Sequence, residues 1–255
     1  MKSDIQPFRM YGNLHFVGSS KVSVHVIKTE VGLVMIDTGY PNMYEQIIES
    51  ITEVGLDPKD ICAIFHSHGH YDHIGCTCRF KALSGAKTYI SRIDNEIVNG
   101  TRDLTLGALC EEPFNCDVLI DDGDTFTFGT TTVRCRLAPG HTEGTLAFFV
   151  NIEENGNRVI AGMHGGLGLN TLKRAWLQNN GFTLAMRDVY RNTLHKLASE
   201  MVDIVMGNHP GQNNTVRKLE KVLAEESVLD ASQWLTLLQT YEEKLDKLQA
   251  DEAAQ

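Results

Sequence analysis

The chain has 255 residues, of which 42% are hydrophobic and 22% are charged, values typical of a globular domain that buries a sizeable core. Its formal net charge of −10 disfavours binding to nucleic-acid phosphates and to anionic membranes. No segment predicts an export signal or a membrane span. We therefore expect one domain over residues 1–255 that acts in the cytoplasm on a small-molecule substrate, with neither nucleic acid nor membrane as a partner. The composition predicts no oligomeric state.

The first half of the chain alternates strand and helix patterns. β-Branched or aromatic runs separated by turn signals predict an antiparallel meander at the start. Apolar residues at helical spacing predict a helix over residues 47–54. The uninterrupted apolar run over residues 61–65 is typical of a strand buried on both faces. The other elements expected here are strands over residues 14–17, 22–27, 33–36 and 88–90 and helices over residues 79–83 and 93–98.

The second half begins with residues 100–117, which show no clear period and predict a loop over the active face. After a second set of strands, a Gly-rich segment over residues 162–170 leads through Trp176 to a helix that ends near Glu200. The amphipathic tail predicts closing helices within residues 215–250. The strands expected here cover residues 118–120, 125–128, 131–137, 145–150, 158–160 and 202–206.

Four of the ten histidines fall within eight residues, directly after the predicted strand over residues 61–65. They are His66, His68, His70 and His73, and Asp72 lies among them. Imidazole and carboxylate groups are ligands that zinc takes in hydrolytic sites. A strand would turn His73 away from His68 and His70, and a helix would turn His70 away from the rest. We therefore expect an irregular loop, at the carboxyl end of the sheet where ligand sites collect.

Four side chains on one loop are too few for two metal sites, so further ligands must come from other segments. His141 follows residues 138–140, and His209 follows residues 207–208, each in a turn after a predicted strand with Gly or Pro beside it. Either histidine alone is typical of a capped or surface residue. The cluster upstream favours a role for both as ligands.

Three short motifs carry a resemblance to a known family. Residues 37–39 read Asp-Thr-Gly after a strand, residues 68–73 have the pattern H-x-H-x-D-H, and residues 139–142 read Pro-Gly-His-Thr. Together they resemble the metallo-β-lactamase superfamily, and the similarity runs over nearly the whole chain. The resemblance implies the α+β fold class and an αββα sandwich, with two mixed sheets flanked by helices and metals at one edge between the sheets.

Departures from the family's pattern narrow the resemblance to one subclass. Residues 161–164 read Ala-Gly-Met-His, where many members carry a metal-bridging aspartate and one lactamase subclass carries a cysteine ligand. The chain is similar to the third lactamase subclass, which uses a late His-Pro-Gly histidine as at residues 209–211, and residues 241–248 look like its closing helix. This implies two Zn²⁺ per chain, bound by His68, His70 and His141 in the first site and by Asp72, His73 and His209 in the second.

These ligands imply a hydrolase. Metal binding lowers the pKa of water from about 15.7 towards about 7, so a metal-bound hydroxide can attack an acyl carbon at neutral pH. Asp72 is the expected catalytic residue, because it would both bind metal and orient the hydroxide. We expect hydrolysis of an amide or lactam-like bond. The alternatives are a thioesterase or lactonase, a di-iron redox enzyme, which Met163 disfavours, and a non-catalytic metal-binding protein, which the complete set of six ligands disfavours.

Other residues near the motifs are expected to support the site rather than bind metal. His66 is predicted to orient a neighbouring backbone or carboxylate group, and Asp37 to anchor the site by hydrogen bonds. We expect the substrate specificity to be determined by residues 100–117 and 163–183. Neither segment contains a recognised motif that would identify the substrate. The sequence assigns no role to His164, Cys76 and Cys78.

Overall fold

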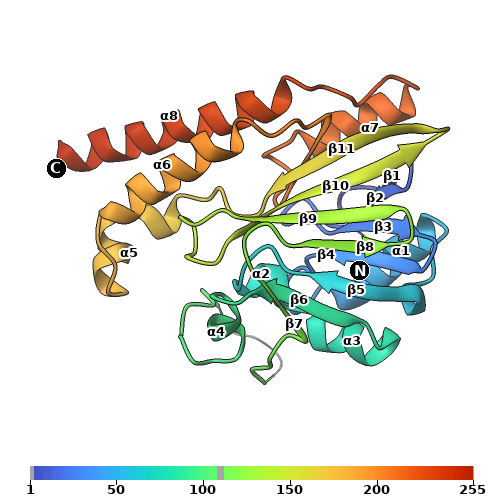
Figure 1. The fold of residues 1–255 in the computed structure, drawn as a ribbon, viewed down its shortest axis with the longest axis horizontal. Coiled ribbons are helices and arrows are strands. Elements are labelled where there is room, and N and C mark those ends of the chain that lie inside the picture. Colours follow the sequence, from blue (N-terminus) through green and yellow to red (C-terminus); the bar gives the residue numbers. More distant parts are fainter. Residues whose placement is uncertain (1–2, 108–111, 255) are drawn as a thin grey trace.

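The computed structural model, which describes residues 3–107 and 112–254, contains two β-sheets that face each other. Helices cover the outer face of each sheet, so the layers run helix, sheet, sheet, helix (Figure 1). Both sheets combine parallel and antiparallel pairs. The expected αββα sandwich of the α+β class is therefore confirmed. Residues 1–2 and 255, and residues 108–111 of the predicted loop, lie outside the described part of the chain.

The strands of each sheet lie side by side in the order in which they occur in the chain, and β12 forms one edge of the second sheet. The first sheet contains β1 (Phe8–Tyr11), β2 (Leu14–Phe16), β3 (His25–Thr29), β4 (Gly32–Ile36), β5 (Ile61–Phe65), β6 (Lys87–Ser91) and β7 (Val118–Ile120). The second sheet contains, in spatial order, β12 (Ile204–Gly207), β11 (Asn157–His164), β10 (Leu146–Glu154), β9 (Thr131–Leu137) and β8 (Thr125–Phe128).

Helices α1 and α3 pack on the first sheet, and α6 and α8 pack on the second (Figure 1). The α-helices are α1 (Tyr44–Glu53), α2 (Tyr71–Ile74), α3 (Thr77–Ser84), α4 (Asn95–Val98), α5 (Arg174–Asn179), α6 (Ala185–Leu197), α7 (Thr215–Leu223) and α8 (Gln233–Ala253). Two 3₁₀ turns cover Pro58–Asp60 and Asn170–Leu172. Among the described residues, none of these helices has the combination of length and apolar composition that a membrane crossing requires.

Aromatic side chains fill the space between the two sheets. The ring of Phe65 stacks on Tyr89 at 4.4 Å and meets Phe148 of the opposite sheet edge-on at 5.9 Å. All three side chains are buried, with Phe65 and Phe148 at 0% exposure. Burial of each such ring stabilises the fold by about 2–3 kcal/mol. This core anchors β5, the strand that leads into the histidine cluster.

The strand ends of both sheets meet at one edge of the sandwich. β4, β5 and β6 run parallel, so their carboxyl ends lie together. The backbone N–H of Leu146, at the start of β10, donates to the carbonyl of Ser67 at 2.8 Å. Beyond β12, the carbonyl of Asn208 accepts from the N–H of Ser23 at 2.9 Å. The segments that carry the histidine cluster, His141 and His209 are thereby brought to the same place.

Several observed elements depart from the predicted ones. Strand β1 lies in a segment for which no strand was predicted. Residues 22–24 were predicted as strand, but they lie outside the observed strands and form backbone hydrogen bonds with residues 17–19 across a turn. The helix predicted to end near Glu200 is α6, which ends at Leu197; the short helix α5, which was not predicted, precedes it and is separated from it by a turn at Gly181, whose φ is +77°. Such a left-handed backbone ends a helix.

The predicted irregular loop is correct only for the first half of the histidine cluster. His70 is extended, and the single helical turn α2 then carries Asp72 and His73. This helical turn places Asp72 and His73 together with His209 at a second position, directly beside that of His68 and His70.

Candidate metal centre

Three histidines from two segments form a first triad, defined as His68, His70 and His141. Their candidate ligand atoms all lie within 4.8 Å of one another. The ring centroids are 4.5 Å apart for His68 and His70 and 4.6 Å apart for His70 and His141. All three residues are buried. The structure thus brings together the three residues that the resemblance assigned to the first zinc.

A second triad, Asp72, His73 and His209, lies beside the first. Oδ2 of Asp72 is 3.5 Å from Nε2 of His73 and 3.7 Å from Nε2 of His209. The rings of His68 and His73, which belong to different triads, are only 4.3 Å apart. The two predicted sets of residues therefore occupy adjacent positions, as a two-metal site requires; their role as ligands stays a prediction.

The buried carboxylate of Asp37 orients histidines of both triads. It accepts a hydrogen bond from Nδ1 of His73 at 2.7 Å and two from Ser67, from the backbone N–H at 2.7 Å and the hydroxyl at 2.8 Å. Because that hydroxyl donates to Asp37, it accepts from Nδ1 of His68 at 3.0 Å. Asp37 therefore anchors the site by hydrogen bonds, as its place in the sequence suggested.

Backbone carbonyls fix two further imidazoles. Nδ1 of His141 donates to the carbonyl of Gly168 at 2.7 Å, and Nδ1 of His209 donates to the carbonyl of Lys21 at 2.7 Å. With Nδ1 protonated, the neutral ring presents the lone pair of Nε2. This pattern, in which the outer ring nitrogen is held by a protein oxygen, is typical of histidines that bind metal.

Three inner ring nitrogens of the cluster lack a hydrogen bond within the described part of the chain. Nε2 of His68, His70 and His73 is buried and makes no hydrogen bond to any described residue. A buried polar atom without a partner costs about 1–3 kcal/mol, so three side by side call for a compensating ligand. A set of imidazoles and one carboxylate fits zinc. We conclude that the residues present fit the metal that the resemblance implies.

Burial keeps the first triad uncharged. It lowers the pKa of His68 and His70 well below the usual value for histidine, and it lowers the pKa of His141 to about 4. His73 differs, because Asp72 and Asp37 outweigh the effect of burial and raise its pKa. A metal ligand must be unprotonated, so the first triad is ready to bind a cation at neutral pH.

The sequence was also compared with known protein families. A family model described as "Metallo-beta-lactamase superfamily" matches residues 17–154, more than half of the chain. The chain belongs to the metallo-beta-lactamase superfamily. The match begins before Asp37 and ends beyond His141, so it includes the first triad, Asp37, Asp72 and His73.

Solved structures from this superfamily share the fold over the full length. BJP-1, a subclass B3 metallo-beta-lactamase of Bradyrhizobium japonicum, has a TM-score of 0.87 at 23% identity, with 99% of this chain and 97% of that chain covered. Native FEZ-1 of Legionella gormanii has a TM-score of 0.88 at 21% identity, with 100% and 99% covered. A motif mutant of a Cronobacter sakazakii metallo-beta-lactamase reaches 26% identity with a TM-score of 0.87, with 98% and 99% covered. The predicted resemblance to the third subclass is confirmed.

Curated relatives match over shorter stretches. A hydroxyacylglutathione hydrolase of Gloeobacter violaceus is 31% identical over 103 residues, which are 40% of this chain and 34% of that protein. An uncharacterized protein of Aquifex aeolicus is 28% identical over 153 residues, 57% of this chain and 66% of that protein. The matched region thus spans from about a third to about two thirds of these relatives. Membership of the superfamily indicates a hydrolase.

A second buried carboxylate, Asp94, joins the two segments of the first triad. It accepts hydrogen bonds from the N–H of Gly69 at 2.9 Å, the hydroxyl of Thr142 at 2.7 Å and the N–H of Gly144 at 2.9 Å. Burial, opposed by these bonds, raises its pKa to about 6. Sequence reasoning missed Asp94, because an aspartate before a short helix is typical of an N-cap, whereas this side chain does not cap α4.

The Gly-rich segment forms a wall against His141. A Cβ atom on Gly166 would lie 2.9 Å from Cβ of His141, and one on Gly168 would lie 3.2 Å from its Cε1. Only glycine allows this approach. Met163 is buried in the core between the sheets, so the described residues place no carboxylate there. His164 is buried next to the wall, accepts from the N–H of Gly166 at 3.2 Å and belongs to neither triad.

Hydrogen bonds outside the two triads support the cluster. Nε2 of His66 lies 3.3 Å from the hydroxyl of Thr77, which is in turn 3.1 Å from the hydroxyl of Thr38. His66 thus takes part in a hydroxyl network and also interacts with the backbone of His73, in agreement with the backbone role predicted for it. The thiol of Cys76 donates to the carbonyl of Tyr40 at 3.0 Å. Neither His66 nor Cys76 belongs to a triad of the described residues.

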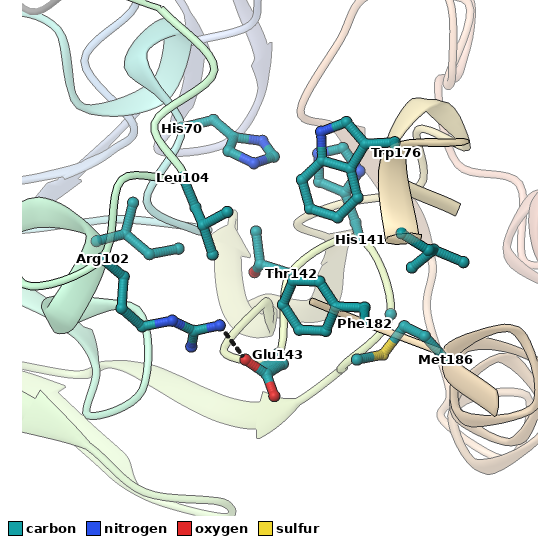
Figure 2. A pocket seen from close by; sticks show the side chains of 12 residues that line it. His70, Arg102, Leu104, His141, Thr142, Glu143, Trp176, Phe182 and Met186 are labelled. Atoms are coloured by element: carbon teal, nitrogen blue, oxygen red, sulfur yellow. Dashed lines mark ion pairs between the residues drawn. The ribbon is translucent and has the colours of Figure 1, made fainter. Parts of the chain in front are cut away.

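The two segments expected to set specificity meet at a pocket beside the first triad. Figure 2 shows Arg102 and Leu104 on one side and Trp176 and Phe182 on the other, with His70 close by. Arg102 and Leu104 come from the predicted 100–117 loop, and the two aromatic residues come from the 163–183 segment. The structure therefore brings parts of both segments together beside His70 and His141 of the first triad.

Proposed function

We propose that this protein is a di-zinc hydrolase that cleaves an amide or lactam-like bond in a small-molecule substrate. The observation that supports this most directly is the pair of adjacent triads, each with its ligand atoms within 4.8 Å of one another. Their imidazole and carboxylate groups suit zinc. Two zinc ions, when bound, acidify a water molecule and polarise the carbonyl group of the substrate.

Asp72 is the residue to which we assign a catalytic role. It is the one carboxylate of the two triads, and its side chain is 14% exposed, on the side of the site open to solvent. One carboxylate oxygen, Oδ2, faces His73 and His209. The other oxygen is able to accept a hydrogen bond from an attacking water and hold it towards the substrate. Asp72 would therefore both bind metal and orient the attacking water.

The comparisons favour an amide or lactam-like bond over the alternatives, and they leave thioester hydrolysis as a second candidate. Structures titled as metallo-beta-lactamases match over nearly the full length of this chain. The match to a hydroxyacylglutathione hydrolase, which supports a thioester substrate, covers only 40% of this chain. A di-iron redox enzyme is disfavoured because a thioether, Met163, stands where such members carry a bridging carboxylate.

Metal analysis combined with an activity assay tests the proposal. We expect about two zinc ions per chain and hydrolysis of a chromogenic cephalosporin. Asp72→Asn should lower kcat by about a hundredfold or more, because an uncharged amide binds metal and holds an attacking water less strongly than a carboxylate does. His209→Ala should leave about one zinc ion per chain. His195→Ala is the matched control, since this histidine lies on α6 with its side chain 58% exposed.

Two results would contradict the proposal. Fewer than two metal ions per chain, with activity unchanged in Asp72→Asn and His209→Ala, would exclude the di-zinc hydrolase. Bound iron with consumption of O₂ would instead support the redox enzyme. Hydrolysis of thioesters in preference to cephalosporins would support the second candidate on the same metal site.

A further inference from the structure

Helix α6 presents a row of three buried hydrogen-bond donors on one face. The donors lie three residues apart, so each is next to the following one on the helix surface, and they are 4%, 0% and 5% exposed. They are Arg187, Tyr190 and Thr193. Each donates at 2.9 Å to a backbone carbonyl outside α6, and these carbonyls belong, in the same order, to Leu172, Leu167 and Pro139. The helix therefore holds two segments that lie outside the strands of the sheet.

The three carbonyls flank a hydrogen bond of the first triad. Nδ1 of His141 donates to the carbonyl of Gly168 at 2.7 Å. Pro139 lies two residues before His141 in the chain. Leu167 and Leu172 lie on either side of Gly168. Helix α6 thus binds both of the segments that this hydrogen bond joins.

Tyr190, the middle residue of the row, contacts both segments. Its hydroxyl donates to the carbonyl of Leu167, the residue that precedes Gly168. Its ring packs against Gly140, the residue that precedes His141. A Cβ atom on Gly140 would lie 2.5 Å from Cδ2 of that ring. The phenol side chain therefore lies between the two segments, with its ring against one and its hydroxyl bonded to the other.

The segment that the hydroxyl holds has little conformational preference of its own. Residues 165–168 read Gly-Gly-Leu-Gly, and glycine restricts the backbone less than any other residue. Hydrogen bonds therefore determine where its carbonyl groups point. The hydroxyl of Tyr190 fixes the carbonyl of Leu167, and the next carbonyl along the chain is that of Gly168. Without the hydroxyl, the carbonyl of Leu167 loses this partner and the segment is free to turn towards another donor.

We propose that Tyr190 is a positioning residue for His141. Its hydroxyl fixes the Gly-rich segment, and the carbonyl of Gly168 then holds Nδ1 of His141. Nε2 of the same ring is thereby directed towards His68 and His70. The proposal rests on the proposed function only where it takes this orientation to determine metal binding at the first triad. It assigns a role in that site to a residue that lies outside every motif of the sequence.

Tyr190→Phe tests the proposal, because it removes only the hydroxyl and leaves the ring against Gly140. In a His209→Ala background, in which the first triad is the complete site, this change should weaken zinc binding about 10–100-fold. In a His141→Ala background it should leave zinc binding at the second triad unchanged. Competition titration with a chromophoric chelator measures both affinities. Tyr89→Phe is the matched control and should change neither, since this tyrosine is 8% exposed and belongs to the core between the sheets.

A second measurement uses the metal-free protein. The Nδ1–H protons of His141 and His209 both donate to backbone carbonyls at 2.7 Å, so both should exchange slowly with water. NMR of ¹⁵N-labelled Tyr190→Phe should show the His141 proton exchanging about tenfold faster or more. The His209 proton should exchange as in the wild type, because its partner is the carbonyl of Lys21. It serves as the internal reference, since a general loss of structure would accelerate both protons.

The outcomes separate this proposal from the proposed function. If neither triad binds zinc but the His141 proton alone exchanges faster in Tyr190→Phe, the di-zinc hydrolase is wrong and the positioning of His141 by Tyr190 stands. If zinc affinity at the first triad is unchanged in Tyr190→Phe, or if exchange is accelerated equally at His141 and His209, Tyr190 does not position His141 and the proposal is overturned.

Discussion

At the scale of single residues, two buried aspartates organise the site without belonging to either triad. Asp37 and Asp94 are each 0% exposed, and each accepts three hydrogen bonds from N–H or O–H donors. Asp37 holds His73 of the second triad directly. Asp94 instead ties the segment around Gly69 to the segment around Thr142, and these two segments carry the first triad.

Exchange of each aspartate for asparagine should affect the two metal positions differently. An amide of equal size offers one acceptor oxygen and turns an N–H₂ group towards existing donors. Asp37→Asn should weaken zinc binding at the second triad about 10–100-fold, and Asp94→Asn should weaken it mainly at the first triad. Competition titration with a chromophoric chelator would resolve two affinities. Each variant controls for the other, and equal loss at both positions in both variants would contradict the assignment.

The sequence predicted the metal-centre residues that lie in motifs and missed those that act across space. His68, His70 and His73 follow a strand that the apolar run identified, and His141 and His209 occupy equivalent strand-end turns. Asp94 and the ion pair between Arg102 and Glu143 escaped prediction, because they belong to none of the recognised motifs and their partners are 25 to 50 residues away in the chain. Only the fold makes these residues neighbours.

At the scale of elements, strands were predicted more accurately than helices. The run of apolar residues that forms β5 has the predicted bounds, Ile61–Phe65, because burial on both faces leaves an uninterrupted apolar signal. The one-turn helix α2 left no such signal, since four residues are too few to show a helical period. Helices α5 and α6 are separated at Gly181, which adopts a left-handed conformation. The composition of the segment alone does not reveal that conformation.

Helices α7 and α8 are joined by a buried lysine. Lys218 on α7 is 5% exposed, and its Nζ donates to the carbonyl of Asn213 at 2.7 Å and to Oε1 of Gln233, the first residue of α8, at 2.5 Å. Nε2 of Gln233 also donates to the carbonyl of Asn213 at 3.1 Å. The ammonium group thereby connects both helices to the segment that follows His209.

This lysine should make stability depend on pH. Burial lowers the pKa of Lys218 to about 8, below its value of 10.5 in the unfolded chain. Between these values the unfolded state binds more protons, so the free energy of unfolding rises with pH. Relative to Lys218→Met, the wild type should gain on the order of 2 kcal/mol from pH 7.5 to 10, measured by urea denaturation. Lys247→Met, at an exposed lysine of α8, should show no such relative change. A difference between wild type and Lys218→Met that is constant with pH would contradict this expectation.

At the scale of the whole molecule, the candidate ligands come from both sheets. His68, His70, Asp72 and His73 follow β5 of the first sheet. His141 lies between β9 and β10, and His209 follows β12, all strands of the second sheet. Each triad therefore takes residues from both sheets. Cations bound there would link the two sheets at the edge of the sandwich, in addition to the aromatic core between them.

Removal of metal should consequently lower the thermal stability of the whole chain. A cation that binds only the folded state at a hundred times its Kd adds about 2.7 kcal/mol, which corresponds to a rise in Tm of about 5–10 °C for a domain of this size. Calorimetry with and without a chelator should show this difference in the wild type and in His195→Ala. In His141→Ala the difference should shrink, because the first triad loses its ligand from the second sheet. Equal Tm values with and without the chelator, in protein shown to contain zinc, would mean that the metal does not link the sheets and that the core alone determines stability.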